Sequence, residues 1–322
     1  MKHTFGPVPS RRLGFSLGID VIPAKTCTLN CVYCQLGPTP ELVLERKPYV
    51  SAETLITEVA QLLQKNPRID FLTFSGSGEP TLNSDLGKMI RGLKKITSIP
   101  VAVITNSSLL YRKEVRRDLM EADVVLPSLD AVSEKAFRGI NRPHPDLKPE
   151  VMIEGLREFS REYPGKIWLE VMLVKGVNDS KAELEKIREI VKSLRINRVR
   201  HSLSLAKADR VQLNTVVRPP AEDGFFPLTQ PELEAAAEII GSGCEIIAEF
   251  IGSAPAHFQV EEKLILATLK RRPLTLKDIV LVTGCNSNEI VKVLGGLTQK
   301  GVVRNQWIGG KEYYSVQGVA RE

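Results

Sequence analysis

The segment Gly14–Cys34 reads GFSLGIDVIPAKTCTLNCVYC. Its first part, Gly14–Ile22, is rich in apolar and β-prone residues and predicts a strand. Its second part places Cys27, Cys31 and Cys34 in one short loop, where three thiolates can converge on a single metal centre. Closed zinc and iron–sulfur sites need four protein ligands, and this loop supplies three. The segment therefore predicts a strand that leads into a [4Fe–4S] cluster with one open iron.

Two other uses of these cysteines remain open from the residues alone. A structural zinc site would need a distant fourth ligand, because none of the histidines, His3, His144, His201 and His257, is near the loop in sequence. A disulfide framework is disfavoured, because five cysteines in a long chain without a secretory leader indicate a reducing compartment. Cys244 and Cys285 are expected to be small, partly buried thiols.

The composition is that of an enzyme-sized globular protein. With 322 residues, of which 43% are hydrophobic, the chain is long enough for a large core and for two domains. No apolar run approaches the roughly 20 residues of a membrane span, and the first residues lack an apolar signal core, so we expect a cytoplasmic protein. The net charge of +6 permits an anionic partner, including nucleic acid.

Strand-like and helix-like runs alternate along the first 250 residues. This alternation, repeated about six times, predicts an α/β domain over residues 1–252, a partial (β/α)6 barrel with helices outside a parallel sheet. Capping residues mark several helix starts, with Ser51 before Thr54 and Ser180 three residues before Glu183. The predicted strands are Gly14–Ile22, Ile69–Phe74, Pro100–Thr105, Val124–Pro127, Ile167–Val174, Arg198–Leu203 and Glu245–Phe250, and the predicted helices are Ala52–Lys65, Ser84–Ile96, Lys113–Glu121, Lys148–Tyr163, Lys181–Leu194 and Gln230–Ile240.

In such a barrel, the loops that follow the strands share the functional face. The cysteine loop follows the first predicted strand, and the glycine-rich loop Phe74–Pro80 follows the second. Its glycines let the backbone approach a small ligand, and the carboxylate of Glu79 can accept hydrogen bonds from an ammonium group. We therefore expect a bound cofactor between the two loops.

The cysteine spacing of three and then two residues, with Tyr33 before the last cysteine, resembles the cluster loop of the radical S-adenosylmethionine (SAM) superfamily. The resemblance implies that SAM chelates the open iron and is reductively cleaved to a 5′-deoxyadenosyl radical, with a flavodoxin or ferredoxin as electron donor. It places Tyr33 against the adenine of SAM. It also assigns the SAM amino group to Ser77, Gly78 and Glu79, although Ser77 stands where the family usually has a glycine.

Polar residues at later strand ends are further candidates for cofactor contact. Short polar groups after the third and fourth strands suit ribose hydroxyls, although the same residue types also occur in turns. After the fifth strand, Lys175 and Asn178 are expected to face SAM or substrate or, for Asn178, to cap the next helix. No residue is assigned as a catalytic acid or base. The ribose candidates are Thr105, Asn106, Ser128 and Asp130, and Arg142 and His144 are either substrate contacts or solvated loop residues.

Two segments lie outside the strand–helix repeat. Ala206–Leu228 is long and irregular, which predicts a lid over the barrel mouth or a linker. Residues 258–322 resemble a winged-helix domain, because Gly309-Gly310 predicts a hairpin after three helices. The predicted helices are Val260–Lys270, Thr275–Val282 and Asn286–Lys300, and the predicted hairpin arms are Val302–Ile308 and Lys311–Val316.

Winged helices bind nucleic acid or dock proteins, and both uses remain open here. Ten Lys or Arg against six Asp or Glu in Phe258–Glu322 make phosphate contact plausible, but the third helix contains Gly295-Gly296 and little arginine for base readout. The opening residues and the cysteine loop resemble a branch related to the wyosine-base synthase, which modifies tRNA. That synthase holds a second cluster through upstream cysteines, whereas no cysteine precedes Cys27.

The sequence thus predicts an oxidoreductase-type radical SAM enzyme that acts on an RNA, such as tRNA, or on a protein or peptide. Activation of a glycyl-radical partner is an alternative within the same chemistry. A regulator in which an iron–sulfur cluster senses oxygen or iron and the winged helix binds DNA is the alternative from another class. Such a sensor would need neither the Gly78-Glu79 loop nor the long strand–helix repeat.

Overall fold

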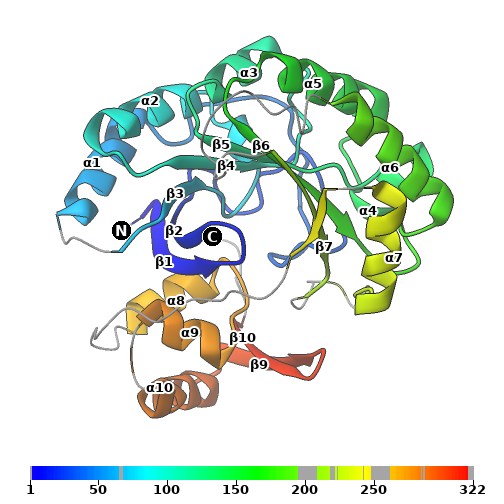
Figure 1. Ribbon diagram of the computed structural model, residues 1–322. Coiled ribbons are helices and arrows are strands. Elements are labelled where there is room, and N and C mark those ends of the chain that lie inside the picture. The colour runs from blue at the N-terminus through cyan, green and yellow to red at the C-terminus, as the bar shows by residue number, and fades with distance from the viewer. Residues whose placement is uncertain are drawn as a thin grey trace.

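The computed structural model describes residues 2–64, 68–194, 209–217, 222, 224–241, 243–247, 262–283, 285 and 287–317. Its main feature is an eight-stranded sheet in which the strands follow one another in chain order (Figure 1). The first two strands are antiparallel, and every later neighbour is parallel. The strands are β1 (Thr4–Ser10), β2 (Gly14–Ile19), β3 (Phe71–Phe74), β4 (Val101–Thr105), β5 (Val124–Pro127), β6 (Lys166–Leu173), β7 (Arg210–Thr215) and β8 (Cys244–Ile246).

Helices cover the outer, convex face of this curved sheet (Figure 1). Leu17 and Ile19 of β2, like alternate residues of the later strands, are fully buried against them. The side chains of Ser51 and Ser180 cap α1 and α6, as their positions in the sequence predict. The helices are α1 (Ala52–Leu63), α2 (Leu86–Ile96), α3 (Lys113–Leu119), α4 (Glu134–Ile140), α5 (Pro149–Glu162), α6 (Lys181–Ser193) and α7 (Gln230–Ile240), with a 3-10 turn at η1 (Pro80–Leu82).

The inner face of the sheet divides into an apolar and a polar part. Val124, Leu126 and Trp168 form a small apolar cluster inside the barrel. Polar side chains occupy other inward positions, where Ser16 Oγ donates to Thr73 Oγ1 at 2.6 Å. Glu170, also inward, pairs with the arginine Arg12. The barrel is therefore closed by apolar packing in one region and offers polar groups in another.

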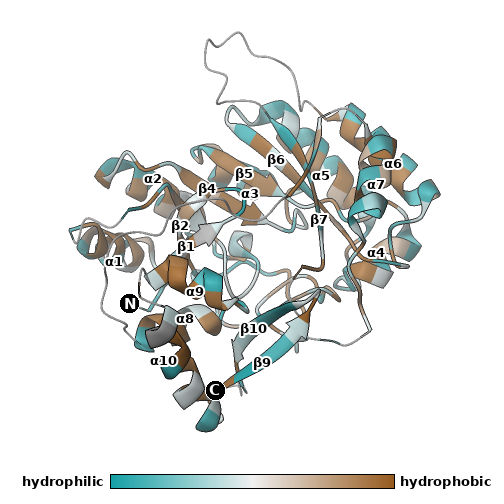
Figure 2. Ribbon diagram, turned by 60° about the horizontal axis from the view of Figure 1, so that its bottom comes forward, coloured by the Kyte–Doolittle hydropathy of each residue, from teal (hydrophilic) through white to brown (hydrophobic). Residues whose placement is uncertain are grey.

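The C-terminal part is a compact unit at the open side of the sheet, next to β1 (Figure 1). Its three helices and hairpin share a core, and Leu274 pairs with Tyr314 of the hairpin. Val282 packs against Phe5 and Val8 of β1, which attaches the unit to the barrel. Figure 2 shows a mostly hydrophilic hairpin. The elements are α8 (Glu262–Leu269), α9 (Leu276–Thr283), α10 (Ser287–Gln299), β9 (Val303–Ile308) and β10 (Lys311–Val316).

Most predicted elements are present within a few residues of their expected bounds, but three were missed. β1 and α4 were not predicted, and the irregular segment expected over Ala206–Leu228 is wrong in its first half, where β7 pairs with β6 and β8. In β7, the buried Val211 and Leu213 alternate with Gln212 and Asn214, which is the pattern of a strand covered on one face. The sheet thus has seven parallel strands, and β7 cannot serve as a lid.

Some expectations fall outside the described residues. The predicted strand Arg198–Leu203 and the proposed boundary between residues 252 and 258 both lie there. None of the helices in the described ranges has the length and apolar surface needed to cross a lipid bilayer.

Candidate active site

The cysteine loop leaves the carboxyl end of β2 and is fixed by backbone hydrogen bonds. Val43 N–H donates to Cys27 O at 3.0 Å, and Cys34 N–H donates to Cys31 O at 3.0 Å. All five cysteines of the chain are free thiols, and the three in the loop are partly buried. The disulfide alternative therefore has no support in the structure.

Each of the three sulfurs faces a nitrogen donor from a different part of the chain. N–H groups directed at sulfur favour the thiolate over the thiol, and they stabilise the negative charge of a thiolate-bound cluster. Two donors are amides at later strand or helix ends, and one is an ammonium within the loop itself. The contacts are Lys25 Nζ to Cys34 Sγ at 3.2 Å, Asn106 Nδ2 to Cys27 Sγ at 3.5 Å and Asn141 Nδ2 to Cys31 Sγ at 3.4 Å.

Burial opposes ionisation of two of these thiols. It raises the pKa of Cys27 to about 11, with help from the nearby Glu79 carboxylate, and it raises the pKa of Cys31 even further. A buried thiol of this kind loses its proton when a metal replaces it, so the donor set fits an iron–sulfur cluster. Within the described ranges, no three His, Cys, Asp or Glu side chains are gathered as a site for a single metal ion.

Glu79 is the buried carboxylate beside the cysteine loop, and the residue is only 3% exposed. Its Oε1 accepts hydrogen bonds from Thr81 N–H, Thr81 Oγ1 and Thr105 Oγ1, at 3.1, 2.6 and 2.7 Å. Its Oε2 accepts from Asn106 N–H alone, at 2.8 Å, and so retains room for a further donor. Burial raises the pKa of Glu79, although these hydrogen bonds oppose the shift. A ligand ammonium would supply the missing counter-charge.

The glycine-rich loop lies directly against the segment that leads to the cysteines. A Cβ on Gly78 would meet Thr26 O at 1.9 Å, so only glycine allows this close approach. Ser77 donates to Asp20 through both its N–H and its Oγ, at 3.1 and 2.6 Å. Gly76 adopts a φ of +140° beside the same carboxylate. The serine at position 77 therefore anchors the loop to Asp20 rather than leaving it open.

A second polar network joins the cysteine loop to strands β5 and β6. Tyr33 OH donates to Asp130 Oδ2 at 2.6 Å, and Asn141 Nδ2 donates to the same oxygen at 2.8 Å. Asp130 Oδ1 accepts from Met172 N–H at 3.1 Å. Burial raises the pKa of Asp130 to about 6, against these hydrogen bonds. Both oxygens of Asp130 thus already have protein partners, and Asp130 orients Tyr33 and Asn141.

The remaining ribose and strand-five candidates are mostly engaged within the protein. Thr105 donates to Glu79, and Asn106 contacts Glu79, Thr28 and Cys27. Ser128 donates its backbone N–H to Thr105 O at 3.0 Å. Asn178 does not cap α6, whose N-cap is Ser180: it accepts from Val174 N–H and donates to the carbonyls of Asp130 and Met172. It ties the ends of β5 and β6 together.

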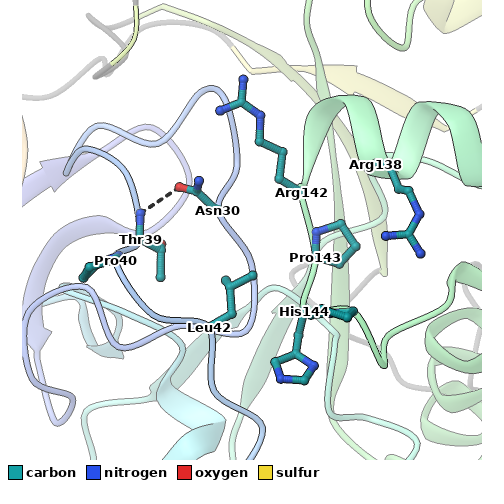
Figure 3. A pocket seen from close by; sticks show the side chains of 9 residues that line it. Asn30, Thr39, Pro40, Leu42, Arg138, Arg142, Pro143 and His144 are labelled. Carbon is teal, nitrogen blue, oxygen red and sulfur yellow. Dashed lines mark hydrogen bonds between the residues drawn. The ribbon is translucent and has the colours of Figure 1, made fainter.

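Arg142 and His144 line a separate pocket of about 570 Å³ with Asn30 of the cysteine loop (Figure 3). Arg142 pairs with Glu222 at 2.7 Å, while Asn30 Oδ1 accepts from Thr39 N–H at 2.7 Å. Lys175 is exposed and pairs with Glu232 at 2.7 Å. The structure therefore groups Arg142 and His144 beside the cysteine loop and places Lys175 in a surface ion pair.

Sequence reasoning missed four residues that organise the site: Lys25, Asn141, Asp20 and Arg271. Lys25 lies two positions before Cys27, so its proximity to the cysteines was visible in the sequence. Asn141 is the C-cap residue of α4, a helix that was not predicted. Arg271 Nε donates to Asp20 Oδ2 at 3.0 Å across 251 positions, a separation at which no local sequence signal exists.

Comparison with known proteins agrees with this geometry. Residues 21–201 match the model of the radical SAM superfamily. A UPF0026 protein of Methanocaldococcus jannaschii is 35% identical over 98% of this chain and 96% of its own length. A protein named GTPase Obg, from Brachyspira hyodysenteriae, is 40% identical over 98% of this chain, which spans only 45% of that relative.

Among solved structures, archaeal TYW1 superposes with a TM-score of 0.38 and 18% identity, over 59% of this chain and 64% of its own. TYW1 is thus a distant structural neighbour, and the closer relationship to the wyosine-base synthase is not shown. The family model and the M. jannaschii relative establish that the chain belongs to the radical SAM superfamily, whose enzymes use a [4Fe–4S] cluster and SAM, and within it to the UPF0026 proteins.

Proposed function

We propose that this radical SAM enzyme modifies an RNA substrate whose target group enters the barrel mouth beside the cysteine loop. The observation that carries the catalytic part is the arrangement of three free thiols, each with its own nitrogen donor, next to the buried Glu79. When bound, the cluster and SAM supply a 5′-deoxyadenosyl radical that abstracts a hydrogen atom from the substrate.

The residues around the site divide the work of holding the two cofactors. Cys27, Cys31 and Cys34 would hold three irons. Glu79 Oε2 would accept the ammonium of SAM, and Gly78 would let the backbone approach it. The other residues proposed to surround SAM are Tyr33, Ser77, Thr105, Asn106, Ser128, Asp130 and Asn178. Of these, Asp130 and Asn178 would contribute by holding neighbouring groups in position.

The C-terminal unit supports an RNA substrate rather than a small molecule alone. Its three helices and hairpin have the order of a winged helix, and its basic residues outnumber its acidic ones. Trp307 on the hairpin is 68% exposed, where an aromatic ring can stack on an unpaired base. We further propose a flavodoxin or ferredoxin as electron donor and a reducing cytoplasm as the location, in keeping with free thiols.

Anaerobic reconstitution followed by addition of dithionite and SAM tests the chemistry. Formation of 5′-deoxyadenosine and methionine is expected, and their absence with an intact cluster would contradict the enzymatic proposal. An anaerobic pulldown from lysate, analysed for both RNA and protein, tests the substrate. Enriched RNA that is lost at high salt is expected. Enrichment of a polypeptide without RNA would replace the RNA substrate with a protein or peptide.

A further inference from the structure

A cavity of about 210 Å³ lies along the inner side of β1 to β4, against the C-terminal unit, and is separate from the pocket of Figure 3. Inward residues of β2 to β4, including Ser16 and Thr73, form one side of it. Gln35, the residue after Cys34, and Gly76 of the glycine-rich loop form another. A group held in this cavity would therefore lie next to both loops of the cofactor site.

Four arginines line the cavity, and none of its described lining residues is acidic. Arg11 and Arg12 come from the turn between β1 and β2, while Arg271 and Arg272 follow α8 in the C-terminal unit. Two pairs of adjacent arginines, separated by about 260 positions in sequence, thus line the same cavity. Such a concentration of guanidinium groups is costly unless it is balanced by negative charge.

Two carboxylates next to the cavity pair with two of these arginines. Glu170 pairs with Arg12 at 2.9 Å, and Asp20 pairs with Arg271 at 3.0 Å. Burial alone would raise the pKa of Glu170, but Arg12 and the amide of Asn214 hold it below its usual value. Both carboxylates lie outside the lining, so the lining side chains that the structure describes include four guanidinium groups and no acidic group.

The C-terminal unit is fixed where its arginines face the cavity. The guanidinium of Arg271 lies over the ring of Phe5, 4.8 Å from its centre, and donates to Ala267 O at 2.9 Å. The ring of Phe5 in turn lies over Gly18, where a Cβ would come within 2.1 Å of it. Tyr313 OH adds a contact with Val217 O at 2.7 Å. The C-terminal unit therefore forms one side of the cavity.

We propose that this cavity binds a phosphate group of the substrate, with arginines from both ends of the chain. The inference rests on the proposed function and names the substrate chemistry of that same site. Guanidinium groups match phosphate oxygens with paired N–H donors and remain charged at any physiological pH. The volume is below the roughly 300 Å³ of pockets that hold whole drug-sized ligands, which fits one phosphorylated unit. The phosphate belongs either to a mononucleotide or to the backbone of an RNA.

Binding of uridine 5′-monophosphate to the full-length, cluster-reconstituted protein tests this proposal. The titration is done by calorimetry with SAM present and no reductant, so that the adenosyl site is occupied and no chemistry occurs. Uridine monophosphate is expected to bind at least tenfold more tightly than uridine. Arg272→Gln and Arg11→Gln should each weaken that binding by about tenfold while SAM affinity is unchanged. Arg161→Gln, at an exposed position of α5, is the matched control and should leave both affinities unchanged.

Two further ligands distinguish the source of the phosphate. The first is tetrauridylate without a terminal phosphate, which carries only backbone phosphates. If it binds as tightly as uridine monophosphate, the site recognises an RNA backbone. If it binds more weakly, the site recognises a phosphate monoester. A hexapeptide of glutamate that displaces the monophosphate at equal concentration would overturn phosphate recognition in favour of carboxylate. The proposal is also wrong if uridine binds as well as its monophosphate, or if Arg272→Gln and Arg161→Gln bind it equally. Formation of 5′-deoxyadenosine after dithionite is added to the same preparation would show that the proposed enzymatic chemistry stands even then.

Discussion

The two halves of the proposed active site, a cofactor half and a cavity half, are built in different ways. The cofactor half consists of two short loops, Thr26–Cys34 and Ser75–Glu79. Their backbones are hydrogen-bonded to each other, and side-chain amides donate to two of the cysteine sulfurs. The cavity half is assembled from Arg11, Arg12, Arg271 and Arg272, which come from opposite ends of the chain. The cofactor half is thus formed almost wholly within the barrel, whereas the cavity half requires the C-terminal unit.

This difference in construction corresponds to two separate functions, cofactor binding and substrate binding. Superfamily members share the cofactor chemistry, and a compact local motif is enough to hold it. Enzymes that share a fold differ in substrate binding, because the residues that bind the substrate lie on elements around the shared site. If the comparison is right, substitutions in one half should leave the other half's ligand unaffected, except at Asp20, Ser77 and Arg271, which join the two halves.

The largest effect is expected for Cys31→Ala. Loss of one of three cysteine ligands should abolish the visible absorbance of the reconstituted cluster and all 5′-deoxyadenosine formation. Uridine monophosphate binding should persist, which calorimetry of the same variant measures. Cys285→Ala, a buried thiol in the C-terminal unit, is the control and should keep the cluster. A cluster of normal intensity in the Cys31 variant would disprove its role as a ligand.

Glu79→Gln should weaken SAM binding by about ten- to a hundredfold, because it removes a charge-assisted hydrogen bond. The glutamine has nearly the same shape, so the cluster and its absorbance should be retained. Equilibrium dialysis with radiolabelled SAM measures the change. Glu53→Gln, on the exposed start of α1, serves as control. Unchanged SAM affinity in the Glu79 variant would remove this residue from the cofactor half.

Arg12→Met should lower the free energy of unfolding by about 3 to 5 kcal/mol, because it leaves the buried Glu170 carboxylate without its cation. In the native protein the pKa of Glu170 is held low, so its contribution is present above the ordinary value of 4.5 and is lost as the pH falls through the lower folded value. The deficit of the variant should therefore shrink at acid pH, where Glu170 is protonated. Urea unfolding at neutral pH and near pH 4 measures both.

The double variant Arg12→Met with Glu170→Met is the control for that experiment. It removes both charges and should be less destabilised than the single variant. Equal losses in the single and double variants would show that the charge pair is not the cause.

The smallest effect is expected for Lys25→Met, which removes the ammonium 3.2 Å from Cys34 Sγ. A cation at this place favours the more negative, reduced cluster, so its loss should lower the midpoint potential, on the order of 50 mV. A redox titration followed by electron paramagnetic resonance measures it. Lys47→Met, exposed and paired with Glu45, should leave the potential unchanged. A rise in potential would contradict the assigned role of Lys25.

The parts of the structure that could be predicted from sequence are those with a local signal. Each of these signals spans only a few residues: the cysteine spacing, the Gly78-Glu79-Pro80 run and the capping serines. Strands β3 to β6 could be predicted because each contains an apolar run. β7 was missed because its polar alternate residues, together with the nearby Pro219-Pro220, resembled a loop.

Contacts between distant residues could not be predicted in this way. Nothing near Asp130 or Asn178 in sequence reveals that their side chains are already bound to protein groups, so both were expected to face SAM. The meeting of Arg12 with Arg271 depends on how the C-terminal unit packs against β1, which is set by Phe5, Val8 and Val282 together. Tertiary packing, rather than propensity, decides these positions.

The carboxylate of Asp20 accepts hydrogen bonds from both Ser77 of the cofactor loop and Arg271 of the C-terminal unit. Any event that tightens one of these bonds alters the geometry available to the other. If the shift of Ser77 on SAM binding changes the affinity for the proposed RNA substrate, thermodynamic reciprocity requires that this substrate change the affinity for SAM by the same factor. Substrate and cofactor would then report on each other through a single side chain.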